Sequence, residues 1–199
     1  MSELTTLILT ILLSLTPYHT DSNFEDEEQR KERMEVIAKA IADVSLRATC
    51  KDIHDKKDCK KIWGGTPKQL AALLIQQGYS ESGFSHHVHA GNCRDDECDA
   101  FKRKDGTIVH LARSSWQMHH TRYTTKYWDK MEGTDYISTW NAAAAATKLL
   151  SRGYASCGSI YGTISQYATG KTCDWKGARK RVTMYKNLRM RLNQPKRNK

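Results

Sequence analysis

The sequence lacks the local patterns that mark several large classes of enzyme. It contains neither a Walker-type phosphate-binding loop nor the glycine pattern of a dinucleotide-binding fold, and both absences argue against a nucleotide-dependent enzyme. It also contains no internal repeats and no long linkers. A chain of 199 residues without such features is expected to form one domain with short appendages.

Acidic residues are absent from the C-terminal part of the chain. The sequence has 32 Lys and Arg against 22 Asp and Glu, and ten of the basic residues lie from Lys176 onward. The other 22 basic residues balance the acids, so the net charge of +10 belongs to the C-terminus. Such a segment favours an anionic partner, namely nucleic acid, a membrane surface or a cell-wall polymer. The alternative is a solvated helix face with a frayed end.

Lysine and arginine are absent before Arg30, in a region that contains an apolar run at residues 4–15. The run is too short to span a lipid bilayer comfortably. It resembles the core of a secretion signal, although no Ala-x-Ala cleavage site follows it. An uncleaved anchor and a packed N-terminal helix are the alternatives. We therefore expect a signal peptide or anchor at residues 1–20, a helix and disulfide loop at 21–65, and the main domain at 66–199.

Six cysteines fall into three pairs that are close in the sequence. An even number of cysteines in such pairs predicts disulfides, although six cysteines allow 15 connectivities. Pairing of neighbours is the simplest, and each bridge would then contribute about 2–3 kcal/mol. Disulfides indicate an oxidising compartment, so the cysteines and the N-terminal run together predict a secreted or periplasmic protein. The three pairs are Cys50–Cys59, Cys93–Cys98 and Cys157–Cys173.

Hydrophobic periodicity predicts a mainly α-helical chain with one small β-hairpin. The hairpin is expected where β-branched residues follow Asp105 and Gly106. An alanine-rich helix after Ser138 should allow another helix to pack closely, and should end at Arg152 and Gly153. The last helix places its apolar residues on one face. Helices are expected at residues 24–49, 66–81, 121–128, 138–153, 158–167 and 174–192.

Glu81 follows the helix that the sequence defines best. Thr66 is a suitable N-cap with Pro67 at the first helical position, and the helix is expected to bury one face and to end between Gly78 and Glu81. Two small residues follow the carboxylate and leave room for a polymer. A carboxyl group that is held partly out of water retains its proton more readily, as a general acid must. A solvated glutamate in a turn is the alternative.

Four short motifs occur in the order found in the lytic transglycosylase and goose-type lysozyme superfamily. Glu81-Ser82-Gly83-Phe84 resembles its Glu-Ser-x-Phe motif, and Ser115-Trp116-Gln117-Met118 resembles its Gly-Leu-Met-Gln motif, with Gln117 as the matching glutamine. Residues 141–150 resemble its Asn-Ile-x-x-Gly-x-x-Tyr-Leu helix, and residues 165–170 its Ala-Tyr-Asn-Ala-Gly segment. The resemblance covers residues 66–192. It implies a lysozyme-like α+β fold, mainly α, with the small β-hairpin beside an active-site cleft.

The resemblance also implies an activity, the cleavage of the β-1,4 bond between N-acetylmuramic acid and N-acetylglucosamine in peptidoglycan. By residue matching, Glu81 is the catalytic residue and protonates the leaving oxygen. Gln117 and Tyr167 would position the muramoyl sugar, with Tyr167 also near Glu81; ordinary packing of the cleft wall is their alternative role. Neither a cofactor nor a metal is expected. The residues expected to bind substrate are Ser82, Ser115, Gln117, His119 and Tyr167.

Two mechanisms are open. Hydrolysis takes two carboxyl groups, and the loop at residues 92–113, which is longer than in the family, carries several acids whose spacing singles out none. In the family, lytic transglycosylases instead use one glutamate as acid and then as base, and the muramoyl 6-hydroxyl attacks to give a 1,6-anhydro end. We favour the transglycosylase. The candidates for a second carboxylate are Asp95, Asp96, Glu97, Asp99 and Asp105, of which Asp99 and Asp105 are retained.

Other functions are less well supported by the residues. A zinc site built from His87, His89, Cys93 and Cys98 matches no standard spacing, and a Cys93–Cys98 disulfide would remove the thiolates. The same disulfide argues against a Cys–His nucleophile.

The aromatic residues of the basic C-terminal helix share its apolar face and are expected to pack, so nucleic acid is not the expected partner. The basic C-terminus instead favours anionic cell-wall or surface polymers, and the protein is expected to be a monomer. The remaining alternatives are a hydrolytic muramidase, a non-catalytic cationic wall-binding or antimicrobial protein, and a chitin-active enzyme.

Overall fold

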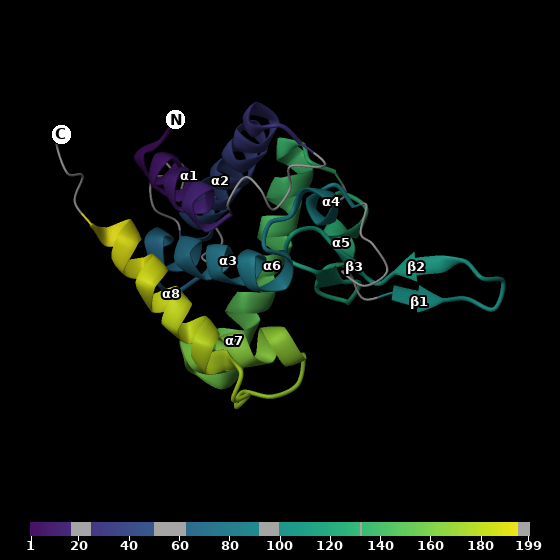
Figure 1. Ribbon diagram of the computed structural model, residues 1–199. Helices are drawn as coiled ribbons and strands as arrows, with labels where there is room; N and C mark the ends of the chain where they lie inside the picture. The colour runs from purple at the N-terminus through teal and green to yellow at the C-terminus, as the bar shows by residue number, and fades with distance from the viewer. Residues whose placement is uncertain (17–24, 50–62, 92–99, 132, 195–199) are drawn as a thin grey trace.

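The computed structural model describes residues 1–16, 25–49, 63–91, 100–131 and 133–194. In these ranges the chain is mainly helical with two small antiparallel sheets, so the predicted mainly α class is confirmed (Figure 1). The helices are α1 (Glu3–Leu15), α2 (Glu27–Thr49), α3 (Pro67–Ser82), α4 (His86–His89), α5 (Thr125–Trp128), α6 (Tyr136–Cys157), α7 (Ile160–Thr169) and α8 (Ala178–Asn193). The strands are β1 (Ala100–Lys102), β2 (Ile108–His110), β3 (Ala112–Arg113) and β4 (Met118–His119).

Helix α3 is the central element of the core. Thr66 caps it through a capping box with Gln69, as the sequence predicts for its start. The prediction of a single buried face is wrong, because every residue from Leu70 to Gly78 is buried. Helices α1, α2, α6 and α8 all contact α3, so this stretch is covered on all sides, the polar Gln76 and Gln77 included.

Gly78 does not end α3, because it serves packing instead. A Cβ atom at this position would lie 2.4 Å from the ring of Phe84, so only glycine allows that ring to approach. The helix continues to Ser82 and ends at Gly83, whose φ of 62° is left-handed. The end lies one residue beyond the predicted range, and Glu81 belongs to the last turn of the helix.

Helix α1 packs into the core against α2, α3 and α8. Ile8 and Leu12 are fully buried, and the Arg30 guanidinium donates to the carbonyl of Leu13 at the helix C-terminus at 3.2 Å. Among the described residues, none of the helices combines the length and hydrophobicity needed to cross a bilayer. The signal peptide and the extracytoplasmic location stay predictions.

Helix α6 is longer than the sequence predicts. It begins at Tyr136 and runs through Arg152 and Gly153 to Cys157, where Gly158 adopts a left-handed φ of 66°. The expectation that Gly153 ends the helix is wrong. A Cβ atom there would lie 3.2 Å from Gln166 Oε1 and 3.4 Å from Thr163 Cα, so α7 packs closely against α6 at this glycine.

Thr121 and Thr124 shorten the helix predicted at residues 121–128 to the single turn α5. The Thr124 hydroxyl donates to the carbonyl of His119 at 2.7 Å and accepts from the amide of Thr121 at 2.8 Å. Such side-chain bonds compete with helical ones. The predicted hairpin is confirmed: β1 and β2 pair antiparallel on either side of Asp105, and they project from the helical body (Figure 1).

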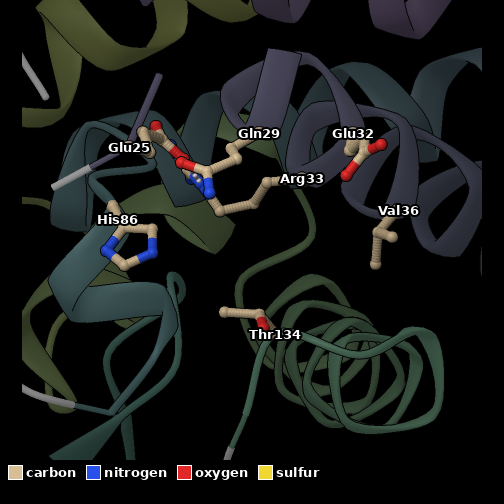
Figure 2. Close-up of a pocket in the computed structure, with 7 residues that line it drawn as sticks. All are labelled: Glu25, Gln29, Glu32, Arg33, Val36, His86 and Thr134. Atoms are coloured by element: carbon tan, nitrogen blue, oxygen red, sulfur yellow. Dashed lines mark hydrogen bonds and ion pairs between the residues drawn. The ribbon is translucent and has the colours of Figure 1, made fainter. Parts of the chain in front are cut away.

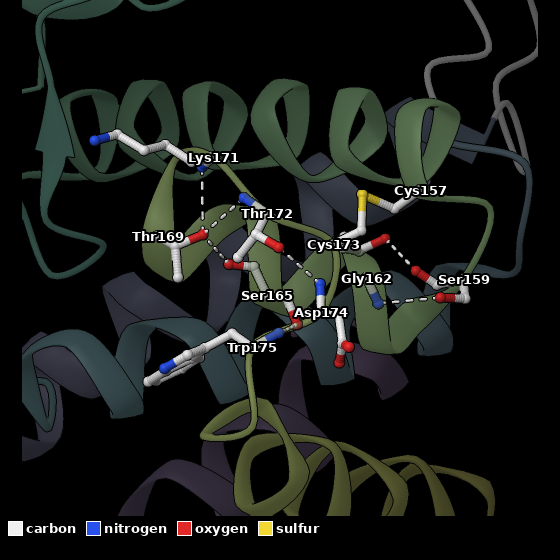
Figure 3. Close-up of a disulfide and its surroundings, with 11 residues drawn as sticks. Cys157, Ser159, Gly162, Ser165, Thr169, Lys171, Thr172, Cys173, Asp174 and Trp175 are labelled. Carbon is white, nitrogen blue, oxygen red and sulfur yellow. Dashed lines mark hydrogen bonds between the residues drawn. A yellow bond between two sulfur atoms is a disulfide. The ribbon is translucent and has the colours of Figure 1, made fainter.

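The predicted Cys157–Cys173 disulfide is present (Figure 3). It joins the end of α6 to the segment before α8 across a sequence separation of 16 residues, a loop length for which a disulfide contributes about 3 kcal/mol. Helix α7 lies inside this loop. The Trp175 amide, just after the disulfide, donates to Ser165 Oγ on α7 at 3.2 Å. The bridge therefore fixes the helix that carries Tyr167. The other two predicted disulfides, Cys50–Cys59 and Cys93–Cys98, lie outside the described residues.

His89 joins the short helix α4 to α6. It is buried, and its Nε2 atom lies 2.9 Å from the Thr139 hydroxyl. Burial is the largest of the effects that lower the pKa of His89 to about 3, and the nearby charges of Arg33 and His86 act in the same direction against the opposing effect of Asp135. The histidine is therefore neutral in the folded protein, whereas in an unfolded chain its pKa returns to the ordinary value of 6.5.

We expect this histidine to make the protein less stable in mild acid. Between pH 6.5 and about 3 the unfolded chain binds a proton that folded His89 does not, so stability is complete above pH 6.5 and falls as the pH decreases. From pH 6.5 to 5 the loss is about 2 kcal/mol. Urea unfolding of the wild type and of His89→Gln at both pH values measures it, with a shallower dependence expected for the variant. Parallel curves would contradict the assignment.

Candidate active site

Glu81 lies in the last turn of α3 and faces α8. Its side chain is 19% exposed and forms an ion pair with the equally exposed Arg181, whose Nη1 atom donates to Glu81 Oε1. The same nitrogen donates to Gln77 Oε1, one helical turn earlier, at 3.2 Å. The Arg181 guanidinium also lies 5.5 Å from the centre of the Trp175 ring. The carboxylate is therefore partly withdrawn from water and held by a fixed cation.

Ser82 joins the end of α3 to the second motif. Its hydroxyl donates to the carbonyl of Ser115 at 2.8 Å and accepts from the Phe84 amide at 3.1 Å. Phe84 has a left-handed φ of 55°, an uncommon conformation for a residue with a bulky side chain. Its ring meets that of Trp116 edge to face at 6.0 Å. These contacts fix the Glu81 turn against the Ser115–Trp116 segment.

A buried ion pair supports the same turn from the other side. Arg33 on α2 binds both carboxylate oxygens of Glu25, at 2.8 and 2.5 Å, and its Nη1 atom donates to the carbonyl of Phe84 at 2.6 Å. The two side chains are only 4% and 2% exposed. The conformation of the Glu81 turn is thus coupled to α2.

The second motif forms a tight turn anchored by Trp116. This ring is fully buried and its Nε1 atom donates to the carbonyl of Leu74 on α3 at 2.9 Å. Ser114 and Gln117 have left-handed φ values of 64° and 47°. The Gln117 side chain is partly exposed, and its Nε2 atom donates to the Ser114 carbonyl at 3.3 Å. Strain in both residues is compatible with a role for this turn beyond packing.

Tyr167 completes the cluster from α7. Its hydroxyl donates to the carbonyl of Trp116 at 2.9 Å and lies 3.1 Å from the sulfur of Met118. Burial raises the pKa of Tyr167 well above 10, and the negative charge of Glu81 raises it further, while Arg181 opposes the shift. The phenol is therefore neutral, and it shares one electrostatic environment with the carboxylate and the guanidinium.

The structure therefore brings together the segments of three of the motifs: Ser82, next to Glu81, bonds to Ser115, and Tyr167 bonds to Trp116. The Gln117 side chain bonds to the Ser114 carbonyl of its own turn. Ser115 is buried, and its hydroxyl has no hydrogen-bond partner in the described part of the chain. His119 lies on β4 opposite Ala112 of β3, with an exposed side chain.

Of the two candidates for a second carboxylate, the described one, Asp105, is not assembled with Glu81. Asp105 is exposed in the turn of the β1–β2 hairpin, which projects from the helices (Figure 1). It accepts from the Thr107 amide at 2.9 Å, a bond that lowers the pKa of Asp105. Asp99 lies outside the described residues, as do Asp95, Asp96 and Glu97.

A cavity of about 320 Å³ lies elsewhere, between α2, α4 and Thr134 (Figure 2). Most of the residues that line it have polar or charged side chains, with Arg33 and Glu25 on one side, and Glu81 is not among them. Within the described ranges no three His, Cys, Asp or Glu side chains are grouped to hold a metal ion. The cysteines of the alternative zinc site lie outside those ranges.

The sequence did not identify Arg181, Gln77 or Arg33 as part of this site. Arg181 belongs to a helix whose basic residues predicted only a solvated or polymer-binding surface. Its contact with Glu81 joins residues 100 positions apart in the sequence. A local sequence pattern cannot predict a contact between residues so far apart. Comparison with protein-family models, with curated proteins and with solved structures finds no match to this chain.

Proposed function

We propose that the protein is a lysozyme-like enzyme that cleaves the β-1,4 bond between N-acetylmuramic acid and N-acetylglucosamine in peptidoglycan. The observation that carries the proposal is the convergence of the motifs: the Glu81 turn is bonded to Ser115, and Tyr167 is bonded to Trp116. These segments lie far apart in the sequence. They meet at one partly exposed carboxylate. This arrangement, together with the order of the motifs along the chain, supports a function like that of the lytic transglycosylase and goose-type lysozyme superfamily.

In this proposal Glu81 is the general acid and base. It protonates the glycosidic oxygen as the bond to the muramoyl C1 breaks, and its carboxylate then accepts the proton of the muramoyl 6-hydroxyl, which attacks C1 to close a 1,6-anhydro ring. Gln117 and the neutral hydroxyl of Tyr167 position the sugar. One carboxylate is sufficient for this route, which suits a site to which Asp105 does not contribute. We therefore favour a lytic transglycosylase over a hydrolase, which needs a second carboxyl group.

The substrate lies outside the cytoplasm, so the proposal includes a secreted or periplasmic, monomeric protein, in keeping with the Cys157–Cys173 disulfide. The exposed basic residues of α8 would bind the anionic wall around the glycan. The same residues favour a second candidate, a cationic wall-binding protein without catalytic activity. They are Arg179, Lys180, Lys186 and Arg189.

Product analysis tests the enzymatic proposal. The full chain is incubated with purified peptidoglycan, and the soluble products are weighed by mass spectrometry. A lytic transglycosylase releases fragments with anhydro ends, which are one water lighter than the ends left by a hydrolase. Hydrolysed ends would replace the transglycosylase with a muramidase. If the wall stays intact after prolonged incubation with folded protein, both enzymatic activities are refuted. The remaining candidate is then the wall-binding protein without catalytic activity.

A further inference from the structure

Arg181 is the feature of the site that the catalytic proposal leaves unused. Its Nη1 atom contacts both Glu81 and Gln77, and its guanidinium lies beside the Trp175 ring. The first partner is charged and the second is a buried amide. The side chain is 19% exposed, so the ion pair lies at the surface of the molecule rather than in its core.

The ion pair opposes the chemistry proposed for Glu81. Arg181 Nη1 donates to Glu81 Oε1, whereas in the first step a proton has to pass from Glu81 to the glycosidic oxygen. While that bond is in place, Glu81 Oε1 cannot carry the proton that the glycosidic oxygen receives. Proton donation from this oxygen therefore requires that the ion pair loosens when substrate binds.

Loosening the pair leaves a partly buried guanidinium without its anion, which is costly unless another anion replaces it. A neutral glycan offers no replacement. A glycan that carries carboxylates does, because a carboxylate matches the planar fork of the Arg side chain in the same way as Glu81. The number of ion pairs is then unchanged, and Glu81 is released.

We propose that Arg181 determines specificity for carboxylate-bearing glycans by exchanging Glu81 for a carboxylate of the muramoyl peptide stem. The inference rests on the proposed function. Arg181 acts through Glu81 and is a positioning residue rather than a proton donor. Exchange couples recognition of the anionic substrate to release of the acid, so neutral β-1,4 glycans are cleaved slowly even where they fit the cleft.

The test compares two forms of one substrate. Soluble peptidoglycan strands are used as isolated, and after carbodiimide coupling to ammonia has converted their carboxylates to amides. The measured quantity is the ratio of kcat/KM on the two forms. We expect the wild type to prefer the charged form by about 10- to 100-fold, the range for one charge-assisted hydrogen bond.

Three variants separate recognition from folding. Arg181→Met should reduce the preference to near unity, and Arg181→Lys should retain part of it because the charge remains. Lys31→Met removes an exposed charge on α2 and should keep the wild-type ratio.

The outcomes distinguish this inference from the function on which it rests. An unchanged ratio in Arg181→Met, or an equal loss on both substrates, would overturn the role in specificity while the enzymatic proposal stands. A folded wild type that cleaves neither substrate would overturn the function and the inference together. Urea unfolding of each variant establishes that it is folded under the conditions in which its kcat/KM is measured.

Discussion

Replacing Glu81 with Gln is expected to lower the rate of peptidoglycan cleavage by about 10²- to 10⁴-fold, the usual contribution of a general acid or base. The amide is close to the carboxyl group in size and can still accept a hydrogen bond from Arg181. It cannot give a proton to the glycosidic oxygen or take one from the 6-hydroxyl. The rate is measured as release of soluble muropeptides from purified walls, with Glu28→Gln on the exposed face of α2 as the matched control.

The same variant separates the enzyme from a cationic binding protein. Because α8 keeps its basic residues, Glu81→Gln should sediment with walls as well as the wild type does. Loss of cleavage with retained binding supports a catalytic carboxylate. A variant that cleaves at the wild-type rate would exclude Glu81 as the acid, and a wild type that kills bacteria no better than Glu81→Gln would favour the binding protein.

Replacing Arg33 with Met is expected to destabilise the protein by about 3–5 kcal/mol. The substitution leaves the carboxylate of Glu25 buried without its cation, which is the costly way to break a buried ion pair. It also removes the bond to the carbonyl of Phe84. Because that carbonyl belongs to the turn after Glu81, the variant that still folds should also cleave peptidoglycan more slowly.

Urea unfolding measures this change against two controls. Lys31→Met removes an exposed charge from the same helix and should alter stability by less than about 0.5 kcal/mol. The double variant Arg33→Met with Glu25→Gln should recover part of the loss, because no charge is then stranded. A single variant as stable as the wild type would mean that the pair contributes no net stability.

The sequence was sufficient to predict those features that depend on residues close together in the chain. Thr66 and Pro67 predicted the start of α3, the cysteine spacing predicted the Cys157–Cys173 bridge, and Asp105 with Gly106 predicted a hairpin. In each case the partners are neighbours in the chain, so the physical cause can be read from a few residues.

Glycines were misinterpreted where tertiary packing decides their role. Gly153 was expected to end α6, and Gly78 marked the earliest expected end of α3. Both lie inside helices, at positions where the Phe84 ring and α7, respectively, pack closely. In the same way, Glu81 could be singled out from its motif, but its partner could not. Arg181 is one of several basic residues of α8, and only the packing of α8 on α3 selects it.

The pairing of Glu81 with Arg181 also constrains the order in which the chain acquires its structure. Contacts between distant residues form late, since a long loop must close before they can be made. During synthesis α1, α2 and α3 can begin to pack while α8 is still being made. The nascent chain therefore carries the carboxylate without the cation, and α3 without the helix that covers its outer face. We expect ribosome-bound chains that end before α8 to expose apolar surface and to depend on chaperones until the last helix docks.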